Sequence, residues 1–173
     1  NIFSTSFQVL FDALKHPAFW ILSATFMICG LSSTGIVGQH FIPFCADNNV
    51  GIVAASSFLA VMGVFNFLGT IGSGWLSDRF DNFKLLMWYY GLRALSLFYL
   101  PFSGFEFYTL ILWAVFFGLD YISTVPPTVK LTGRYFGQVK GPILFGWIFA
   151  VHQFGSAIAA SSAGWSRDTL LSY

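Results

Sequence analysis

Charged residues are scarce in this sequence. Lys and Arg number 8 and Asp and Glu number 7 among 173 residues, or 9% of the chain. Soluble domains carry about 25% charged residues because their surfaces face water. A chain that is 56% hydrophobic, with 22 Phe, cannot cover a water-exposed surface with so few charges. The composition therefore excludes an ordinary soluble domain and predicts a membrane protein.

Residues for catalysis and metal binding are also few. The two cysteines, Cys29 and Cys45, do not form a CxxC pair, and the three histidines are scattered along the chain. The sequence contains no GxxxxGK[ST], GxGxxG, GxSxG or HExxH motif, which would indicate nucleotide, nucleophile or zinc chemistry. The net charge of +1 does not favour nucleic acid as a partner. We expect no enzyme activity, no metal, no cofactor and no nucleic-acid partner.

Long apolar runs dominate what is present. A bilayer core of about 30 Å requires about 20 apolar residues in a helix, and five runs separated by short polar connectors are long enough. These facts predict an all-α fold, a polytopic membrane helix bundle in which residues 1–16 precede the first span and residues 17–173 form one domain. The five expected spans are 17–44, 51–76, 85–102, 107–125 and 141–164.

The basic residues predict the orientation of the bundle. Short cytoplasmic loops of membrane proteins are enriched in Lys and Arg. If Asn1–His16 is cytoplasmic, the 77–84 and 130–140 loops are cytoplasmic too. That side then carries Lys15, Arg79, Lys84, Lys130, Arg134 and Lys140, whereas the opposite ends carry Asp47, Glu106, Arg167 and Asp168.

Two charged residues lie inside expected spans. Arg93 is nine residues past Lys84, and Asp120 is ten residues before Lys130, so both lie about 13–15 Å from the cytoplasmic end of their helices. A charge at mid-membrane costs at least about 2.5–3.5 kcal/mol and is a functional hypothesis by default. Their shared depth and opposite signs predict an ion pair. The alternative is that Arg93 extends to the interface and Asp120 pairs elsewhere.

A helix end or kink is expected at Pro126 and Pro127. Pro126 and Pro127 remove two backbone donors and restrict the residue before them. Ser123, Thr124, Pro127 and Thr128 follow Asp120 at helical spacing, so this polar face should point into the bundle. Irregular backbone at membrane depth is tolerated only where it is buried in protein or lines a cavity.

The middle of the fifth span carries His152 and Gln153. A satisfied hydrogen bond between helices is one interpretation of His152, and a substrate contact or a proton-titrating group is the other. Gly155, Ala159 and Ala163 repeat as small residues four apart, a spacing that favours close helix packing.

Polar residues inside other spans complete the set of candidates. Asn66 in the second span and Gln39 in the first are further candidates for a cavity lining, whereas isolated hydroxyl groups more often bond their own helix. Buried polar groups dispersed over several spans near mid-depth are typical of a transporter, and favour one over a channel or an enzyme.

One stretch, "GSGWLSDRFDNFKLL" at residues 72–86, resembles a family signature. Gly74, Leu76, Asp78 and Arg79 match the G-x-L-x-D-R-x-G-R-R pattern between the second and third helices of each half of major facilitator superfamily transporters. Asp81 replaces the usual Gly, and the degenerate pattern is typical of the C-terminal half. Gly69, Gly72 and Gly74 predict close packing of the preceding helix.

Other stretches support the same resemblance. The segments "HPAFWILSATF", "YYGLRALSLFYLPF", "GLDYISTVPPTV" and "FGWIFAVHQFGSAIAA" fit this family. The last is similar to bacterial transporters of the monocarboxylate and oxalate/formate branch.

The resemblance implies twelve helices in two halves of six around a central cavity. The five spans would be helices seven to eleven, "SRDTLLSY" would be an outer loop before helix twelve, and the N-terminal half would be a partner missing from this chain. The first, second, fourth and fifth helices of a half line the cavity. The implied cavity residues are Gln39, Asn66, Asp120, His152 and Gln153, with Arg93 in an ion-pair network near the cytoplasmic gate or acting as an anion partner.

The expected function is secondary active transport of a small organic anion by alternating access, with proton coupling, in a bacterial inner membrane. His152 or Asp120 would be the protonatable group. The motif residues Gly74, Leu76, Asp78 and Arg79 would form a cytoplasmic gating latch against the other half. The alternative is a membrane sensor or scaffold on the same fold that transports nothing.

Overall fold

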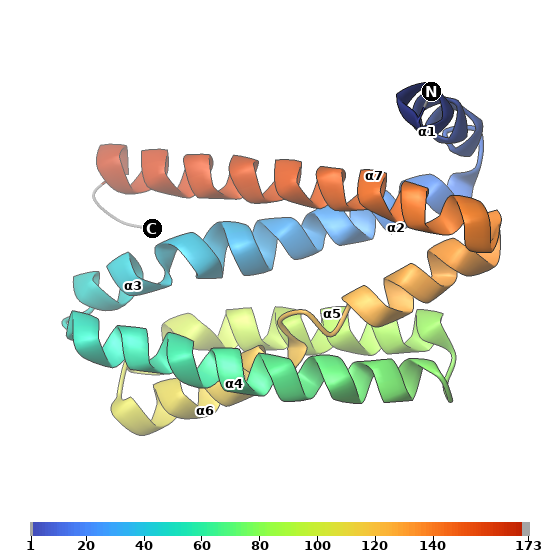
Figure 1. Cartoon of the computed structure of the whole chain (residues 1–173). Coiled ribbons are helices and arrows are strands. Elements are labelled where there is room, and N and C mark those ends of the chain that lie inside the picture. The colour runs from blue at the N-terminus through green and yellow to red at the C-terminus, as the bar shows by residue number, and fades with distance from the viewer. Residues whose placement is uncertain (1, 171–173) are drawn as a thin grey trace. The chain divides into compact units, whose positions relative to one another are not determined.

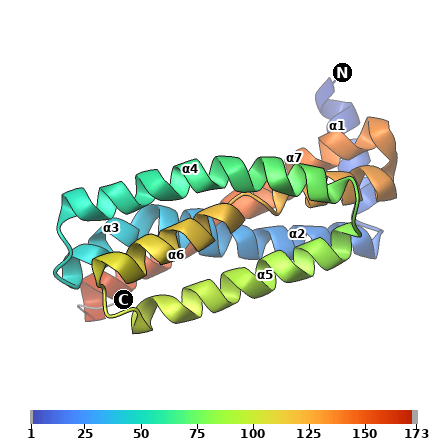
Figure 2. The ribbon, with the colours of Figure 1, turned by 90° about the horizontal axis from the view of Figure 1, so that it is seen from below.

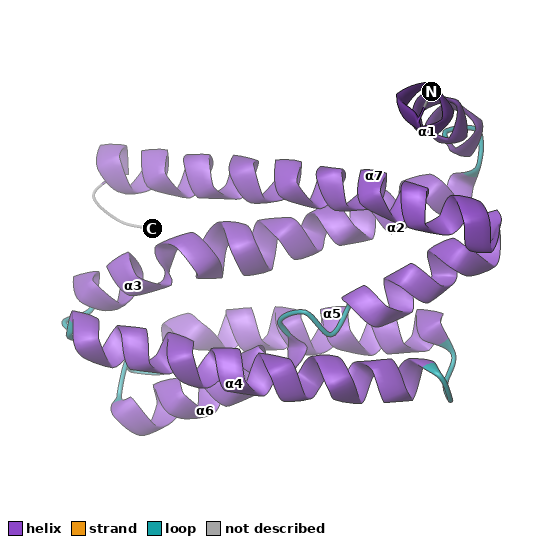
Figure 3. Ribbon diagram, in the orientation of Figure 1, coloured by secondary structure: helices purple, strands orange, loops and turns teal. Residues whose placement is uncertain are grey.

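The computed structural model describes residues 2–170, with side chains from Thr5 onward. These residues form helices joined by short turns, with no strand among them (Figures 1 and 3), which confirms the all-α prediction. Asn1 and residues 171–173, at the ends of the expected N-terminal segment and outer loop, lie outside the described residues. The chain divides into two compact units, one of the residues up to Gly38 with those from Thr128 on, the other of Gln39–Pro127.

Nine elements follow one another over residues 2–170. Five of them, from α3 to α6, fall largely or wholly in the second unit, and the other four belong wholly or mainly to the first. In order they are α1 (Ile2–Ala13), α2 (Pro17–Cys29), the π-helix η1 (Gly30–Val37), α3 (Gly38–Asp47), α4 (Ile52–Ser77), α5 (Asn82–Tyr99), the 3₁₀ turn η2 (Leu100–Phe102), α6 (Phe107–Asp120) and α7 (Val125–Leu170).

Within the described residues, three helical stretches are long and apolar enough to cross a membrane: Pro17–Asp47, Ile52–Ser77 and Phe107–Leu170. The third has 64 residues and includes the turns at 121–124 and the bend at Gly137. One crossing requires about 20 residues, so this stretch is long enough for two. α5 has 18 residues, or about 27 Å, but Lys84 and Arg93 reduce its apolar character. The number of crossings therefore remains a prediction.

The helix from Pro17 to Asp47 is continuous but changes type in its middle. Pro17 occupies the first turn, where its missing N–H costs nothing. Residues Gly30–Val37 then form a π-helix, a rare form that is often found at functional sites. Ser32 and Ser33 donate to the carbonyls of Ile28 at 2.8 Å and Cys29 at 2.5 Å, so their hydroxyls bond their own helix.

The expected helix over 107–125 ends earlier, at Asp120, and residues 121–124 form turns before α7 begins. The prolines explain this position. In a continuous helix, the rings of Pro126 and Pro127 would meet the carbonyls of Ile122 and Ser123, and neither proline could donate a hydrogen bond to them. In the first turn of α7 the same prolines are tolerated. The predicted break is confirmed, five residues before the predicted end of the span.

α7 differs from the expected loops at both of its ends. Residues 130–140, predicted as a loop, are helical except at Gly137, whose φ of 82° and ψ of 163° bend the helix. Only glycine adopts this conformation readily. The outer loop expected from Ser166 is helical as far as Leu170, and the expected N-terminal segment contains α1.

In the second unit, α4 and α6 pack with their backbones in close contact. A Cβ added to Gly69 would meet the backbone of Leu119, and one added to Gly118 would lie 2.6 Å from the Met62 carbonyl oxygen. The predicted close packing is confirmed at Gly69. It is wrong at Gly72 and Gly74, where no described residue would lie within 4 Å of an added Cβ, because these glycines point away from α6.

In the first unit, α2 and η1 lie beside the second half of α7 (Figures 1 and 2). A Cβ on Gly30 would overlap the His152 backbone, and one on Gly155 would lie 2.5 Å from the Met27 carbonyl oxygen. Farther along, a Cβ on Gly35 would lie 2.6 Å from that of Ala159. The predicted close packing of the small residues on this helix is confirmed at Gly155 and Ala159.

Candidate functional site

The candidate residues fall into two groups, one in each unit. Asn66, Arg93, Asp120 and Gln39 belong to the second unit, and His152 and Gln153 belong to the first. The structure brings together three of the first group, whereas Gln39 is exposed on α3.

Arg93 and Asp120 form a buried ion pair. Nε of Arg93 donates to Oδ2 of Asp120 at 2.7 Å, and the two side chains are 1% and 8% exposed. The predicted pairing is therefore confirmed, and the alternative in which Arg93 extends to the interface is wrong. Removing one partner of such a pair leaves an uncompensated charge in a low-dielectric environment.

Arg93 also holds the broken backbone that follows α6. Its Nη2 donates to the carbonyl oxygens of Asp120 at 2.7 Å and Tyr121 at 3.1 Å. These carbonyls lie where the regular helix stops. They therefore lack the hydrogen bond that the N–H of the residue four positions later would donate in a continuous helix. A planar guanidinium with several donors suits this combined contact with a carboxylate and two carbonyls.

Two side chains from α4 bond the same break. Ser73 Oγ donates to the carbonyl oxygen of Ser123 at 2.5 Å, the carbonyl that would have bonded to residue 127 in a continuous helix. Because Pro127 has no N–H, Ser73 replaces the missing donor. The amide oxygen of Asn66 accepts from the Ile122 N–H at 3.2 Å.

The break at 121–124 is thus surrounded by polar partners from α4 and α5. Discontinuous helices whose freed backbone groups are bonded by protein often form substrate and ion sites in transporters. Within residues 2–170, Oδ1 of Asp120 is buried and has no hydrogen-bond partner. This oxygen can accept a proton or a ligand donor without breaking a hydrogen bond.

A groove between α5 and α6 reaches Asp120. Its cavity volume is about 520 Å³, within the usual range for small-molecule sites. Trp113 closes one side, with its Nε1 donating to the Ser96 carbonyl at 3.0 Å. The lining is mainly apolar and consists of Tyr89, Leu92, Leu95, Ser96, Tyr99, Leu112, Trp113, Phe116, Leu119 and Asp120.

His152 lies in an aromatic environment in the first unit. Its ring stacks on Phe149, with centroids 5.3 Å apart and planes 6° apart, and meets the Phe26 ring of α2 at 4.9 Å. The residue is 5% exposed, and its Nδ1 lies 3.1 Å from Oε1 of Gln153. Gln153 itself is exposed, so it connects the buried imidazole to the surface of this unit.

The motif residues lie where α4 ends. Gly74 and Leu76 are in its last turns and Asp78 follows it. The Arg79 guanidinium stacks 3.9 Å above the Trp75 ring, an attraction between a cation and an aromatic face. Asp81, which replaces the usual Gly, accepts from the N–H groups of Phe83 and Lys84 and caps α5.

Ser73 was missed as a site residue, although the sequence carries a signal for it. It follows Asn66 by seven residues, two helical turns, and so lies on the same face of α4. No three His, Cys, Asp or Glu side chains in residues 2–170 gather as a metal site requires.

Comparisons with known proteins identify relatives over most of the chain. Monocarboxylate transporter 12-B of Danio rerio is 24% identical over 92% of the chain and 34% of its own length. The MFS-type transporter YcxA of Bacillus subtilis is 28% identical over 84% of the chain and 36% of its own length. Monocarboxylate transporter 12 of Xenopus laevis is 26% identical over 92% and 35%.

The chain spans about a third of the length of these curated relatives. No family model matches it, and no solved structure matches it. The relatives are nevertheless named as transporters, as the motif at Gly74, Leu76, Asp78 and Arg79 predicts, and the chain has helices long and apolar enough to cross a membrane. The predicted family is therefore confirmed: the homologues of this chain are transporters of the major facilitator superfamily.

Proposed function

We propose that this chain is the C-terminal half of a secondary active transporter that moves a small organic anion by alternating access. The observation that carries the proposal is the buried Arg93–Asp120 pair beside a helix break, with an intramembrane carboxylate oxygen that lacks a partner among the described residues. The homology to transporters supports the same function.

The proposed substrate is a small carboxylate, moved together with a proton. Support comes from the relatives named as monocarboxylate transporters and from the chemistry of the pair. Protonation of Asp120 at Oδ1 would leave the Arg93 charge uncompensated, while the carbonyls of Asp120 and Tyr121 would still hold its guanidinium. An anion would then restore neutrality. His152, which is buried in the other unit, is the second candidate for proton coupling, because an imidazole is the side chain most easily moved across neutral pH.

We also propose five membrane crossings at the predicted spans in a bacterial inner membrane. Asn1–His16 and the connections at 77–84 and 130–140 would face the cytoplasm. Asp78 would meet the N-terminal half of the transporter at the positive end of a helix. Asn66, Gln39 and Gln153 remain proposed cavity residues, with Asn66 also bonded to the break.

Uptake by the full-length protein in proteoliposomes tests this function. We expect a labelled monocarboxylate to accumulate when the outside is acidic, and Asp120→Asn and His152→Ala each to reduce the rate at least tenfold. Ser57→Ala is the matched control, since this exposed serine bonds, among the described residues, only the Val53 carbonyl of its own helix, at 2.8 Å.

Two outcomes would contradict the proposal in different ways. If uptake is unchanged in folded Asp120→Asn and His152→Ala variants, the site assignment fails. If the folded wild-type protein moves none of a panel of small organic anions across the membrane, transport of this class of solute fails, and the absence of flux for any solute favours the sensor or scaffold.

A further inference from the structure

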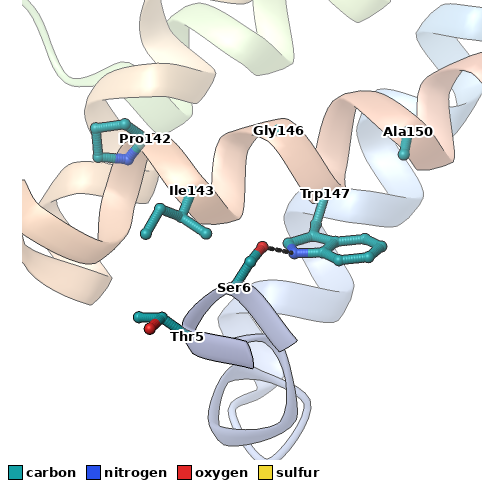
Figure 4. Close-up of a pocket in the computed structure, with 7 residues that line it drawn as sticks. All are labelled: Thr5, Ser6, Pro142, Ile143, Gly146, Trp147 and Ala150. Carbon is teal, nitrogen blue, oxygen red and sulfur yellow. Dashed lines mark hydrogen bonds between the residues drawn. The ribbon is translucent and has the colours of Figure 1, made fainter. Parts of the chain in front are cut away.

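A groove lies between α1 and α7 in the first unit (Figure 4). Its cavity volume is about 710 Å³, which falls in the range of small-molecule sites. No residue proposed for transport lines it. The lining consists of Thr5 and Ser6 from α1, and Pro142, Ile143, Gly146, Trp147 and Ala150 from α7.

The groove follows from the small residues on one row of α7. Pro142, Gly146 and Ala150 are spaced by four residues, so they lie one above the other on the same face. Figure 4 shows Ser6 directed toward Trp147, whose Nε1 donates to the Ser6 hydroxyl oxygen at 3.1 Å. This contact fixes α1 beside α7 without filling the row of small residues.

Basic side chains lie near one end of the groove. Lys140 is three residues before Ile143 and seven before Trp147, and therefore lies on the face of α7 that these two residues share. Its Nζ lies 3.9 Å from Oδ2 of Asp12 on α1, and Lys15 lies at the same distance from Oδ1. The three side chains are 53–78% exposed, so the ion pairs are weak. Two cations share one carboxylate, which leaves a net positive charge.

The surroundings of the groove are apolar. Phe7, which contacts the Trp147 ring with centroids 5.3 Å apart, is 48% exposed, and Phe11, one turn farther along α1, is 63% exposed. A helix with exposed aromatic residues and basic neighbours is typical of the boundary between lipid headgroups and acyl chains. These features favour a lipid over a water-soluble ligand.

We propose that this groove binds one anionic phospholipid. An acyl chain lies along Pro142, Gly146 and Ala150, and the phosphate lies at the end that carries Lys140 and Lys15. Ser6 accepts a hydrogen bond from Trp147, so its O–H is able to donate to a glycerol ester oxygen. The site is separate from the proposed transport residues and does not depend on transport.

Native mass spectrometry of the intact full-length protein tests the site, using phosphatidylglycerol and phosphatidylcholine of matched chain length. The wild type should retain phosphatidylglycerol at least tenfold more strongly than phosphatidylcholine. Gly146→Leu should abolish retention, because its side chain fills the groove where no described residue lies within 4 Å of an added Cβ. Ala150→Leu is a second variant of the same kind. Lys140→Gln should weaken the retention of phosphatidylglycerol and leave that of phosphatidylcholine unchanged.

Gly91→Leu is the matched control, since Gly91 on α5 has equally open surroundings among the described residues but lies outside the groove. Equal retention of the two lipids by the wild type would overturn the proposal. So would unchanged retention in both groove-filling variants, or an equal loss in Gly91→Leu. Crosslinking of a Gly146→Cys variant to another segment of the full-length protein would also overturn it, because that segment would then occupy the groove.

Discussion

The two units pack membrane-type helices in different ways. In the second unit the helix is interrupted at 121–124, and charged and polar side chains from α4 and α5 bond the exposed backbone. In the first unit α2, η1 and α7 remain helical where they touch, and glycines bring the backbones together. Both units bring backbones together at glycines, but the second unit also depends on specific hydrogen bonds to a broken helix.

This difference follows from the cost of unbonded backbone groups in a membrane. A buried N–H or C=O without a partner costs several kcal/mol in lipid, so a broken helix requires partners such as Arg93, Asn66 and Ser73. An intact helix requires no such partners, and the hydroxyls of Ser32 and Ser33 donate to carbonyls of their own helix. Loss of the polar side chains at the break should therefore damage the second unit, whereas the α2–α7 contact of the first unit should be damaged by added volume at its glycines.

The largest expected effect is at Arg93. Arg93→Leu leaves Asp120 charged and unpaired and removes donors to two carbonyls, so we expect the free energy of unfolding to fall by about 3–5 kcal/mol. Denaturant titration of the full-length protein in detergent measures this change. Arg93→Leu combined with Asp120→Leu should be less destabilised than Arg93→Leu alone, and equal or greater loss in the double variant would contradict the account.

The second largest effect is expected at the glycine contacts of the first unit. Gly155→Leu places a side chain against the Met27 backbone, and overpacking of this kind typically costs about 1–3 kcal/mol. Gly63→Leu is the control, because no described residue lies within 4 Å of a Cβ at Gly63. The same titration should show a lower free energy of unfolding for Gly155→Leu and no change for Gly63→Leu. Equal free energies of unfolding in the two variants would contradict the importance of the close backbone contact.

A smaller effect is expected at Asn66. Asn66→Leu leaves the Ile122 N–H without its acceptor, which should reduce the free energy of unfolding by about 1–3 kcal/mol, toward the lower end because the site is only part-buried. Hydrogen exchange at the Ile122 amide provides a local measurement. Faster exchange in Asn66→Leu than in Ser57→Ala supports the contact, and equal exchange counts against it.

The sequence predicts the charged and proline-dependent features of this fold. A common depth and opposite signs were sufficient to pair Arg93 with Asp120, because an isolated charge is costly in a membrane. Pro126 and Pro127 predicted the break, because proline is the residue type that lacks a backbone N–H donor. Small residues at helical spacing predicted the contact at Gly155.

Other features depend on three-dimensional neighbours and could not be predicted. The π-helix at Gly30–Val37 has no simple residue signature. At Gly72 and Gly74, the absence of described neighbours near an added Cβ depends on the direction in which α6 runs. The partner of Ser73 is a backbone carbonyl, a group that every residue carries. The helical backbone on both sides of Gly137 within 130–140 was hidden because its basic residues resemble those of a loop.

The central claim is that side chains replace the hydrogen bonds lost at the helix break, and the pair Ser73 and Pro127 tests it most directly. Pro127→Ala restores the N–H that Ser73 replaces at the Ser123 carbonyl. A double-mutant cycle on the free energy of unfolding separates this coupling from local packing effects.

We predict that Ser73→Ala lowers the free energy of unfolding by about 1–2 kcal/mol when residue 127 is Pro, and by less than about 0.5 kcal/mol when it is Ala. An equal loss in both backgrounds would contradict the claim.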